Sequence, residues 1–332
     1  MNCSVNFDSI VMIHMDIKVS VYCIVYNHEK YIREALEGFI KQQTDFSFEV
    51  IVHDDASTDK TVEIIKEYEL KYPEIIKPIF QKENQYSKGE NIEVAFMLPV
   101  THGKYIALCE GDDYWTDSRK LQKQYDYMED HPECSLVAHR ALTLNMNNGK
   151  FCDYTNYQFP DNKLTAEQII ENQTFFPTAS MFFRKKYYEN NRDFILSIRN
   201  FDYVAKILLA TEGDTYVFPE IMSVYRKGTD GSWTERINNN SKKYYEHLRQ
   251  SIDTLGKINI YRNFEFNEAI QSNILRREFY AEISIMNLKV LKDSKYSSLR
   301  KELPLHSRLI LYIKKYFPFL YKYYKAAHKK SR

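Results

Sequence analysis

The chain has 332 residues, with 46 lysine and arginine residues against 45 aspartate and glutamate residues, and a formal net charge of +1. This near balance provides no overall basic field, so we expect no nucleic-acid partner. The five cysteines are scattered, and their spacing indicates neither a zinc site nor a disulfide framework. No stretch approaches 18 uninterrupted apolar residues, so no transmembrane helix is predicted.

Residues 1–17 are an unassigned leader. They lack the basic segment that begins a signal peptide, and polar residues interrupt their apolar stretch. The choice between Met1 and Met15 as the start is left open. Because neither a signal peptide nor a disulfide framework is indicated, a cytoplasmic location is expected.

Strands and helices alternate over the first half of the chain. The strands are predicted at 19–25, 48–53, 75–80 and 105–109, and the helices at 29–42, 59–71, 91–98 and 118–130, with a polar loop at 81–89. Apolar, β-branched runs of this length indicate strands that are buried on both faces. The alternation predicts a parallel α/β sheet flanked by helices.

The second half adds a few more strands and then becomes helical. Strands are predicted at 136–144, 179–183, 215–218 and 221–225, helices at 165–170, 201–210, 241–257 and 262–292, and a polar, turn-rich stretch at 145–162. We therefore predict a sheet domain at 18–235 and a helical C-terminal extension with a basic, aromatic tail at 236–332. The sheet domain divides into a nucleotide half, 18–117, and an acceptor half, 118–235.

Two of the predicted parallel strands end in paired aspartates. Asp54 and Asp55 follow one strand, and Glu110, Asp112 and Asp113 follow another. Parallel strands end at the same edge of a sheet, where open α/β proteins bind ligands. Crowded carboxylates repel one another unless a cation lies between them, and Mg²⁺ or Mn²⁺ prefers carboxylate oxygen. The alternative is that these residues only form turns and cap helices.

Three spaced motifs together resemble family 2 glycosyltransferases. They are the strand and turn at 19–27, the segment 49–59 with the sequence EVIVHDDASTD, and the segment 110–115 with the sequence EGDDYW. The resemblance covers roughly residues 18–233. It implies the GT-A fold and transfer of a sugar from a nucleotide-sugar to an acceptor with inversion at the anomeric carbon.

The resemblance also implies roles for residues that bind the nucleotide. Asp55 corresponds to the residue that hydrogen-bonds the base, Asp54 is its neighbour, and Tyr26 would lie against the base. Arg226 or its neighbour Lys227, in a segment that resembles a loop over the donor, would contact phosphate, and Lys88 is a lesser prediction for the same contact.

For the metal, the resemblance points to the acidic segment. Glu110 and Asp112 stand where the family has an Asp-x-Asp motif, and Asp113 is predicted to be the direct ligand of Mn²⁺ or Mg²⁺. Asp112 would approach the ribose or the metal. Two residues depart from the family pattern, namely Glu110 in place of an aspartate and Gly228 in place of a histidine.

An inverting transfer needs a base that removes a proton from the acceptor hydroxyl. In the family this carboxylate begins a helix in the second half, and Asp202 matches that position. The alternative for Asp202 is stabilisation of a helix N-terminus through the dipole, and Asp193 is a weaker candidate for the base.

The expected function is a metal-dependent, non-processive transferase in cell-surface polysaccharide synthesis. The donor is predicted to be a nucleotide-sugar, with UDP as the usual nucleotide, and the acceptor a glycan or a lipid-linked glycan. The Gln-x-x-Arg-Trp motif of processive synthases is absent from the sequence. The aromatic, basic tail at 305–330 predicts contact with the inner membrane surface. Packing of the C-terminal helices on their own domain or in a homo-oligomer is the alternative.

Other classes of protein were weighed against this function. The runner-up is a catalytically inactive sugar-nucleotide-binding protein that assembles other proteins. A nucleotidyltransferase would need a glycine-rich phosphate loop after the first strand, and a dinucleotide-dependent oxidoreductase would need Gly-x-Gly-x-x-Gly; neither motif is found. A hydrolase with paired carboxylates remains an alternative that acceptor dependence would distinguish.

Overall fold

The computed structural model describes residues 16–172, 174–198, 201–230 and 240–320. Their strands form one mixed sheet in the order β3-β2-β1-β4-β9-β6-β10-β5, with β7 beside β6 and β8 beside β10. The strands are β1 (Ile17–Val25), β2 (Ser47–Asp54), β3 (Ile76–Phe80), β4 (Tyr105–Leu108), β5 (Tyr114–Trp115), β6 (Cys134–Asn145), β7 (Lys150–Asp153), β8 (Lys163–Leu164), β9 (Phe182–Arg184) and β10 (Asp214–Lys227).

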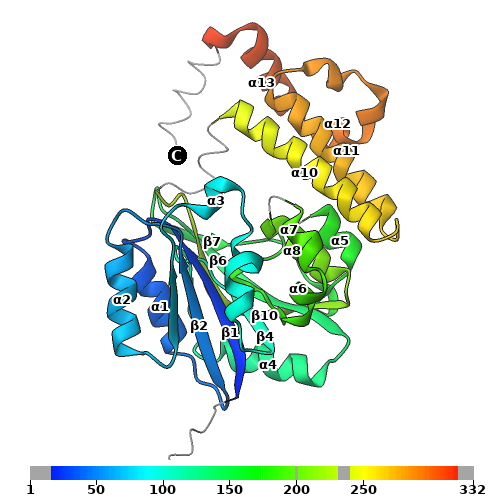
Figure 1. The fold of residues 1–332 in the computed structure, drawn as a ribbon. Helices are drawn as coiled ribbons and strands as arrows, with labels where there is room; N and C mark the ends of the chain where they lie inside the picture. Colours follow the sequence, from blue (N-terminus) through cyan, green and yellow to red (C-terminus); the bar gives the residue numbers. More distant parts are fainter. Residues whose placement is uncertain (1–15, 173, 199–200, 231–239, 321–332) are drawn as a thin grey trace, which may run out of the picture.

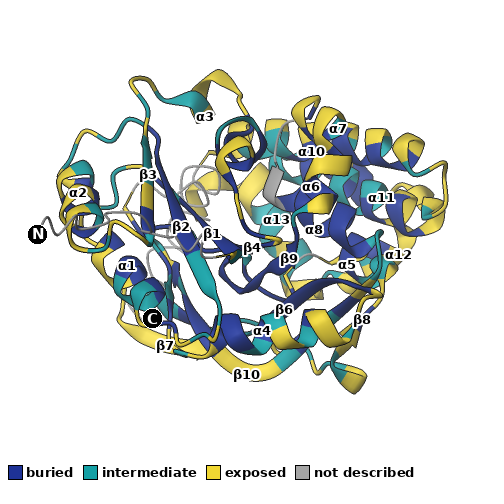
Figure 2. Cartoon of the chain, turned by 60° about the horizontal axis from the view of Figure 1, so that its bottom comes forward, coloured by how far each residue is buried: buried dark blue, intermediate teal, exposed yellow. Residues whose placement is uncertain are grey.

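The first four strands of this order form the parallel part of the sheet, as predicted. β2 pairs in parallel with β1 and β3, and β1 pairs in parallel with β4. β9 is antiparallel to both β4 and β6, and it joins this part to the parallel pair of β6 and β10. Figure 2 shows these central strands largely buried beneath helices whose outer faces are exposed. The predicted α/β fold class is therefore confirmed.

The helices of the sheet domain follow from their apolar faces and caps. They are α1 (Ile32–Ile40), α2 (Thr61–Lys71), α3 (Gln85–Lys88), α4 (Lys120–Asp130), α5 (Ala166–Glu171), α6 (Lys186–Asn190), α7 (Arg192–Leu196) and α8 (Phe201–Ala210). In α1, the residues Ile32, Ala35, Leu36 and Phe39 are buried at helical spacing against β1 and β2. α5 begins with a capping box between Thr165 and Gln168.

Several predicted elements differ in detail. The polar loop 81–89 contains the short helix α3, and the helix predicted at 91–98 is a π-helical turn, Glu93–Met97, followed by a 3-10 turn, Leu98–Val100. The two strands predicted at 215–218 and 221–225 are one long strand, β10, because register shifts against β6 absorb the irregular residues between them. The stretch 145–162 contains β7, which pairs with β6.

The C-terminal helices are α10 (Ser241–Tyr261), α11 (Asn267–Ser284), α12 (Ser297–Glu302) and α13 (Leu305–Tyr316). In Figure 1, α10 and α11 lie on the side of the molecule toward which β1 and β2 run. Leu255 and Ile258 of α10, with Ala269 and Ile270 of α11, are buried in one core with residues of the sheet. These two helices therefore share the core of the sheet domain. Among the described helices, none is long and apolar enough to span a membrane.

Candidate active site at the carboxyl edge of the parallel strands

The two acidic segments lie at the same edge of the sheet. Asp54 at the end of β2 is in register with Val25 at the end of β1, and Leu108 at the end of β4 is in register with Tyr22. Beyond Leu108 the chain stays against β1, because the Gly111 amide donates to the Ile24 carbonyl at 3.0 Å. The acidic residues of both segments therefore flank the end of β1, as the strand order requires.

The ends of β1 and β2 are tied together by left-handed residues. Asn27 has a φ of 57° and Ala56 a φ of 63°. The Asn27 amide donates to Ser57 Oγ at 2.8 Å, and its side-chain oxygen accepts from the Thr58 amide at 2.7 Å. Such strained residues persist where the surrounding structure fixes them, which is common at ligand sites.

The first aspartate pair is buried and already hydrogen-bonded. Asp54 Oδ2 accepts from the Ser57 amide at 3.0 Å, and burial raises the pKa of the Asp54 carboxyl. The two Asp55 oxygens accept from the amides of Gln85 and Tyr86, at 2.7 and 3.1 Å, and so hold the start of α3. Asp55 thus positions the loop after β3, and its predicted contact with a nucleotide base stays a prediction.

Gly111 lets the acidic segment approach β1. A Cβ atom at this position would lie 2.2 Å from Val25 Cγ1 and 3.0 Å from His28 Nδ1. Any side chain would therefore push the segment away from the strand end. His28 lies at the start of α1, where burial lowers the pKa of its imidazole and the carboxylates Asp112, Asp59 and Asp54 oppose that shift.

The segment after β10 holds the acidic residues from the other side. Asp113 Oδ1 accepts from the Arg226 amide at 2.8 Å, and Asp112 Oδ2 accepts from Thr229 Oγ1 at 2.9 Å. Burial and the neighbouring Asp112 raise the pKa of the Asp113 carboxyl, and Arg226 opposes them. Asp112 remains partly exposed, whereas Asp113 is fully enclosed.

Arg226 contacts several protein groups, and its predicted phosphate contact stays a prediction. Its guanidinium donates to the Asp112 carbonyl at 2.7 Å and pairs with Glu34 of α1, and it lies over the rings of Tyr114 and Tyr31. Only 4% of Arg226 is exposed. In this geometry the guanidinium braces the acidic segment, and its bonding capacity is directed at protein groups.

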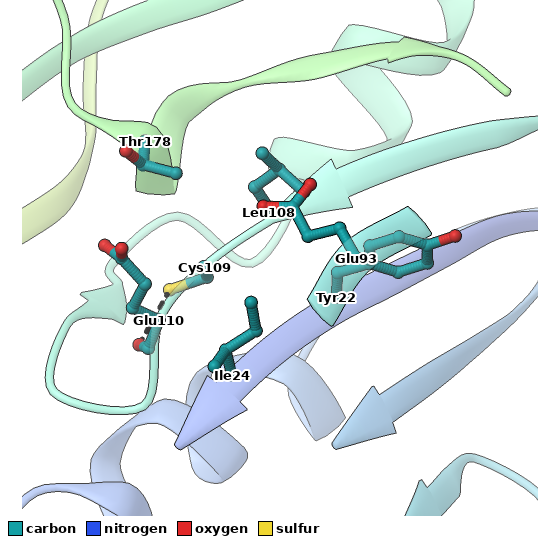
Figure 3. Close-up of a pocket in the computed structure, with 7 residues that line it drawn as sticks. All are labelled: Tyr22, Ile24, Glu93, Leu108, Cys109, Glu110 and Thr178. Carbon is teal, nitrogen blue, oxygen red and sulfur yellow. Dashed lines mark hydrogen bonds between the residues drawn. The ribbon is translucent and has the colours of Figure 1, made fainter. Parts of the chain in front are cut away.

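The metal ligands predicted from the sequence are adjacent but do not form a closed site. Among the described residues, no three His, Cys, Asp or Glu side chains are grouped so as to hold a metal ion. Glu110 lies beside a small cavity of about 10 Å³ that is also lined by Ile24, Cys109 and Thr178 (Figure 3). A cavity of this volume accommodates about one water molecule.

Several buried polar atoms near this edge have no hydrogen-bond partner in the part of the chain that the structure describes. They include Asp54 Oδ1, Asp113 Oδ2, His28 Nδ1 and His53 Nδ1. Buried polar atoms are nearly always paired, so these unpaired atoms require an explanation. Asp113 Oδ2 in particular is a carboxylate oxygen of the kind that a hard cation binds, and the donor set fits Mg²⁺ or Mn²⁺, which need only one or two protein carboxylates.

Among the described side chains, the other residues predicted for the site have few contacts with the acidic segments. Tyr26 follows β1 and is 41% exposed, which leaves its ring open to a ligand. Lys88 is exposed and pairs with Glu83. Asp202 is the second residue of α8, at the predicted helix start, but its side chain lies outside the described residues. Asp193 is in α7 and fully exposed, beside Arg192.

Sequence reasoning missed two residues that organise the site, Thr229 and Glu34. Thr229 lies three residues after Arg226, and nothing in its local sequence signals a contact with Asp112 across 117 positions. Glu34 appeared only as an acidic residue on a predicted helix. Both contacts arise because β10 and α1 come together at this edge of the sheet.

An α/β sheet with acidic segments at the carboxyl edge of its parallel strands, flanked by helices, is the arrangement of the GT-A class of fold. The chain belongs to glycosyl transferase family 2, whose family model matches residues 20–191. Among curated relatives, an uncharacterised protein of Mycobacterium tuberculosis is 35% identical over 228 residues, which are 69% of this chain and 64% of the relative. The chain thus spans just under two thirds of that relative's length.

Solved structures of glycosyltransferases share the fold. The Staphylococcus aureus protein TarS, residues 1–349, in complex with UDP-GlcNAc superposes with a TM-score of 0.61 at 19% identity, over 95% of this chain and 93% of that chain. The mannosyltransferase PcManGT of Pyrobaculum calidifontis, in complex with GDP-Man and Mn²⁺, gives a TM-score of 0.56 at 16% identity, over 93% and 83% of the two chains.

Proposed function

We propose that the protein is an inverting, metal-dependent, non-processive glycosyltransferase. It moves a sugar from a UDP-sugar to a glycan or lipid-linked acceptor in cell-surface polysaccharide synthesis. The observation that carries this proposal is that the buried carboxylate oxygens Asp54 Oδ1 and Asp113 Oδ2 have no partner among the described residues, at the carboxyl edge of the parallel strands of a family 2 chain.

Within this proposal, the chain's own groups divide the work of holding the donor. Tyr26 offers an exposed ring to the base, and Asp54 and Asp55 are buried at the end of the neighbouring strand β2. Asp113, with Asp112 beside it, would hold the divalent cation, which stabilises negative charge on the leaving nucleotide when bound. Arg226 and Thr229 fix those carboxylates in place before any ligand arrives. Such preorganisation lowers the cost of reorganisation during the reaction.

Asp202 is the proposed base. Its place near the start of α8 fits a carboxylate that accepts the proton of the acceptor hydroxyl as the new glycosidic bond forms. UDP is proposed because the TarS structure holds UDP-GlcNAc, and the GDP-Man complex of PcManGT supplies the competing nucleotide to test.

We also propose that the protein works on the cytoplasmic side of the cell membrane and touches its surface through α13. Large apolar side chains of this region are exposed, namely Leu305, Leu309, Tyr316, Phe317, Phe319 and Leu320. Basic residues lie among them, including Arg308, Lys314 and Lys315. This combination of apolar and basic residues suits an anionic bilayer surface.

Calorimetric titration of UDP, GDP and dTDP, each with Mn²⁺ and with EDTA, tests the donor site. We expect one nucleotide to bind only with the metal, and Asp113→Asn to abolish that binding. Asp45→Asn is the matched control, because Asp45 is exposed and precedes β2 at the opposite edge of the sheet. Metal-independent binding that survives in Asp113→Asn would contradict the proposed site.

A turnover assay separates the enzyme from the inactive binder. Release of free nucleotide from the matching nucleotide-sugar should rise when an acceptor extract is added, and Asp202→Asn should remove that rise without preventing nucleotide binding. Tight nucleotide binding with no turnover under any acceptor condition would favour the assembly protein. Turnover that is independent of acceptor would favour the hydrolase.

A further inference from the structure

A second cavity lies away from the strand edge, between α5 and the C-terminal helices. It has a volume of about 230 Å³ and is lined by Glu171 at the end of α5, Tyr244 of α10, and Asn273, Arg276, Arg277 and Tyr280 of α11, among others. Its volume is below that of a typical drug-sized pocket, so it suits a single sugar residue or a similar small group. None of its lining residues belongs to the donor site described above.

Arg277 distinguishes this cavity from an ordinary surface hollow. Its Nε donates to Asn273 Oδ1 at 2.9 Å, and its guanidinium lies 4.3 Å from the centre of the Tyr203 ring. Within the described part of the chain, no carboxylate forms an ion pair with it. Its neighbour Arg276, by contrast, pairs with Glu302 at 2.7 Å. A half-buried guanidinium in an aromatic setting, with no ion pair among the described residues, is a ready partner for an anion.

The positive charge of Arg277 shifts the pKa of a neighbouring histidine. Burial and this charge together lower the pKa of His247 in α10 to about 4, so the histidine adds no charge of its own at neutral pH. Among the described residues that line the cavity, Glu171 is the one carboxylate, and it is exposed at the rim. Within this described lining, the interior presents the Arg277 cation together with tyrosine and amide groups.

The cavity adjoins the helix that carries the proposed base. Asn273 Nδ2 lies 3.1 Å from the hydroxyl of Tyr203, and Tyr203 directly follows Asp202 in α8. A molecule seated against Arg277 would therefore lie beside the first turn of α8. This position suits the acceptor rather than the donor, whose predicted ligands lie at the ends of β1, β2 and β4.

We infer that this cavity is an acceptor subsite that takes an acidic saccharide, with Arg277 bound to the carboxylate or phosphate group of the sugar. This inference rests on the proposed function and deepens it by naming the class of acceptor. The hydroxyls of Tyr244 and Tyr280 would bind the sugar hydroxyls, Glu171 at the rim would accept from another, and Asn273 holds Arg277 in place. Arg277 binds and positions the acceptor, and it takes no part in the chemical step.

The test is a binding comparison on the full chain with the donor site occupied by UDP and Mn²⁺. Glucuronate and glucose 6-phosphate are the acidic probes, and glucose is the neutral probe, with binding followed by ligand-observed NMR. We expect both acidic probes to bind roughly tenfold or more tightly than glucose, since hydrogen bonds to charged groups are the stronger ones. A carboxylate-only or phosphate-only preference identifies which acidic group the site takes.

Variants assign the preference to the cavity. Arg277→Met should remove the preference for acidic probes, while Arg249→Met, an exposed arginine of α10 outside the cavity, should keep it. Arg277→Lys keeps the charge and should retain part of the preference. Because Arg277 also packs on Tyr203, the thermal midpoint and UDP binding are measured on each variant to confirm that it is folded.

Each outcome decides whether the cavity binds acidic sugars, and it can be distinguished from a failure of the donor site. Equal binding of acidic and neutral probes by the wild type, or an unchanged preference in folded Arg277→Met, overturns the inference. Binding of UDP with no binding of any sugar overturns it as well and leaves the transferase proposal standing. Failure of UDP to bind at all counts against the proposed function, while the probe preference and its loss in Arg277→Met still decide the chemistry of the cavity.

Discussion

Arg226 Nη1 donates to the main-chain carbonyl of Asp112 at 2.7 Å, across 114 positions of the sequence. The bond joins the end of β10 to the acidic segment after β4, and the same arginine reaches Glu34 on α1. Three separate parts of the chain therefore depend on one buried guanidinium. The acidic segment is consequently a braced element rather than a free loop.

Arg226→Met should destabilise the protein and weaken nucleotide binding together. The substitution leaves the Asp112 carbonyl without its donor and removes the positive charge that opposes the rise in the pKa of Asp113. We expect a loss of about 2 to 3 kcal/mol in the free energy of unfolding, measured by urea denaturation. The partner Glu34 is largely exposed, so its ion pair adds little to this figure. Full stability with lost nucleotide binding would instead indicate a direct phosphate contact.

Gly111→Ala should disrupt the docking of the acidic segment on β1. The new methyl group would meet Val25 and His28, and overpacking of this kind costs about 1 to 3 kcal/mol. Gly256→Ala is the matched control, because Gly256 lies within α10 with no atom within 4 Å of the added Cβ. The control should be neutral or stabilising by up to about 1 kcal/mol. Equal thermal midpoints for the two variants would contradict the close packing of Gly111.

Lys120 predicts a specific pH dependence of stability. The side chain is fully buried, its amino group lies 3.9 Å from the centre of the Trp115 ring, and it donates a hydrogen bond to Gln124. Burial lowers the pKa of Lys120 to about 7, and Cys109 and Asp117 oppose this shift. Between pH 7 and the ordinary lysine pKa of 10.5, the unfolded chain holds this proton and the folded chain does not. Stability from this group therefore rises as the pH rises through that window.

Comparison of the wild type with Lys120→Met isolates the contribution of this lysine to the pH dependence of stability. Relative to the variant, the wild type should gain up to about 1.4 kcal/mol per pH unit above pH 7 and show a constant difference below it. Urea denaturation at unit steps from pH 6 to pH 10 measures both slopes. Parallel stability curves for the two proteins would show that the lysine keeps its proton when buried.

The exposed face of α13 predicts binding to anionic membranes. The full chain should sediment with phosphatidylglycerol vesicles and not with phosphatidylcholine vesicles, and Leu309→Asp should weaken that binding several-fold. Leu70→Asp is the control, since Leu70 is equally apolar and even more exposed, on α2. If Leu309→Asp leaves vesicle binding unchanged but lowers the mass measured by light scattering, the face is a subunit interface instead.

The sequence by itself determined the order of elements and the edge at which the site forms. Runs such as 19–25 and 48–53 are mostly apolar and rich in β-branched residues, which indicates interior strands. Parallel strands end at the same edge of a sheet, so Asp54 and Asp112 come to one edge. Local spacing also placed the start of α8, with Asp202 as its second residue, and the start of α10 at Ser241.

Only the tertiary structure decided what those carboxylates contact. Asp55 holds α3. Asp113 accepts from the Arg226 amide and Thr229 bonds to Asp112, because β10 pairs with β5 directly after the acidic segment. Contacts separated by more than a hundred residues leave no periodic signal in a single sequence. The cavity around Arg277 likewise exists only because α10 and α11 pack into the core of the sheet domain. Its half-buried position, with no ion pair among the described residues, is what distinguishes Arg277 from the other arginines of these helices.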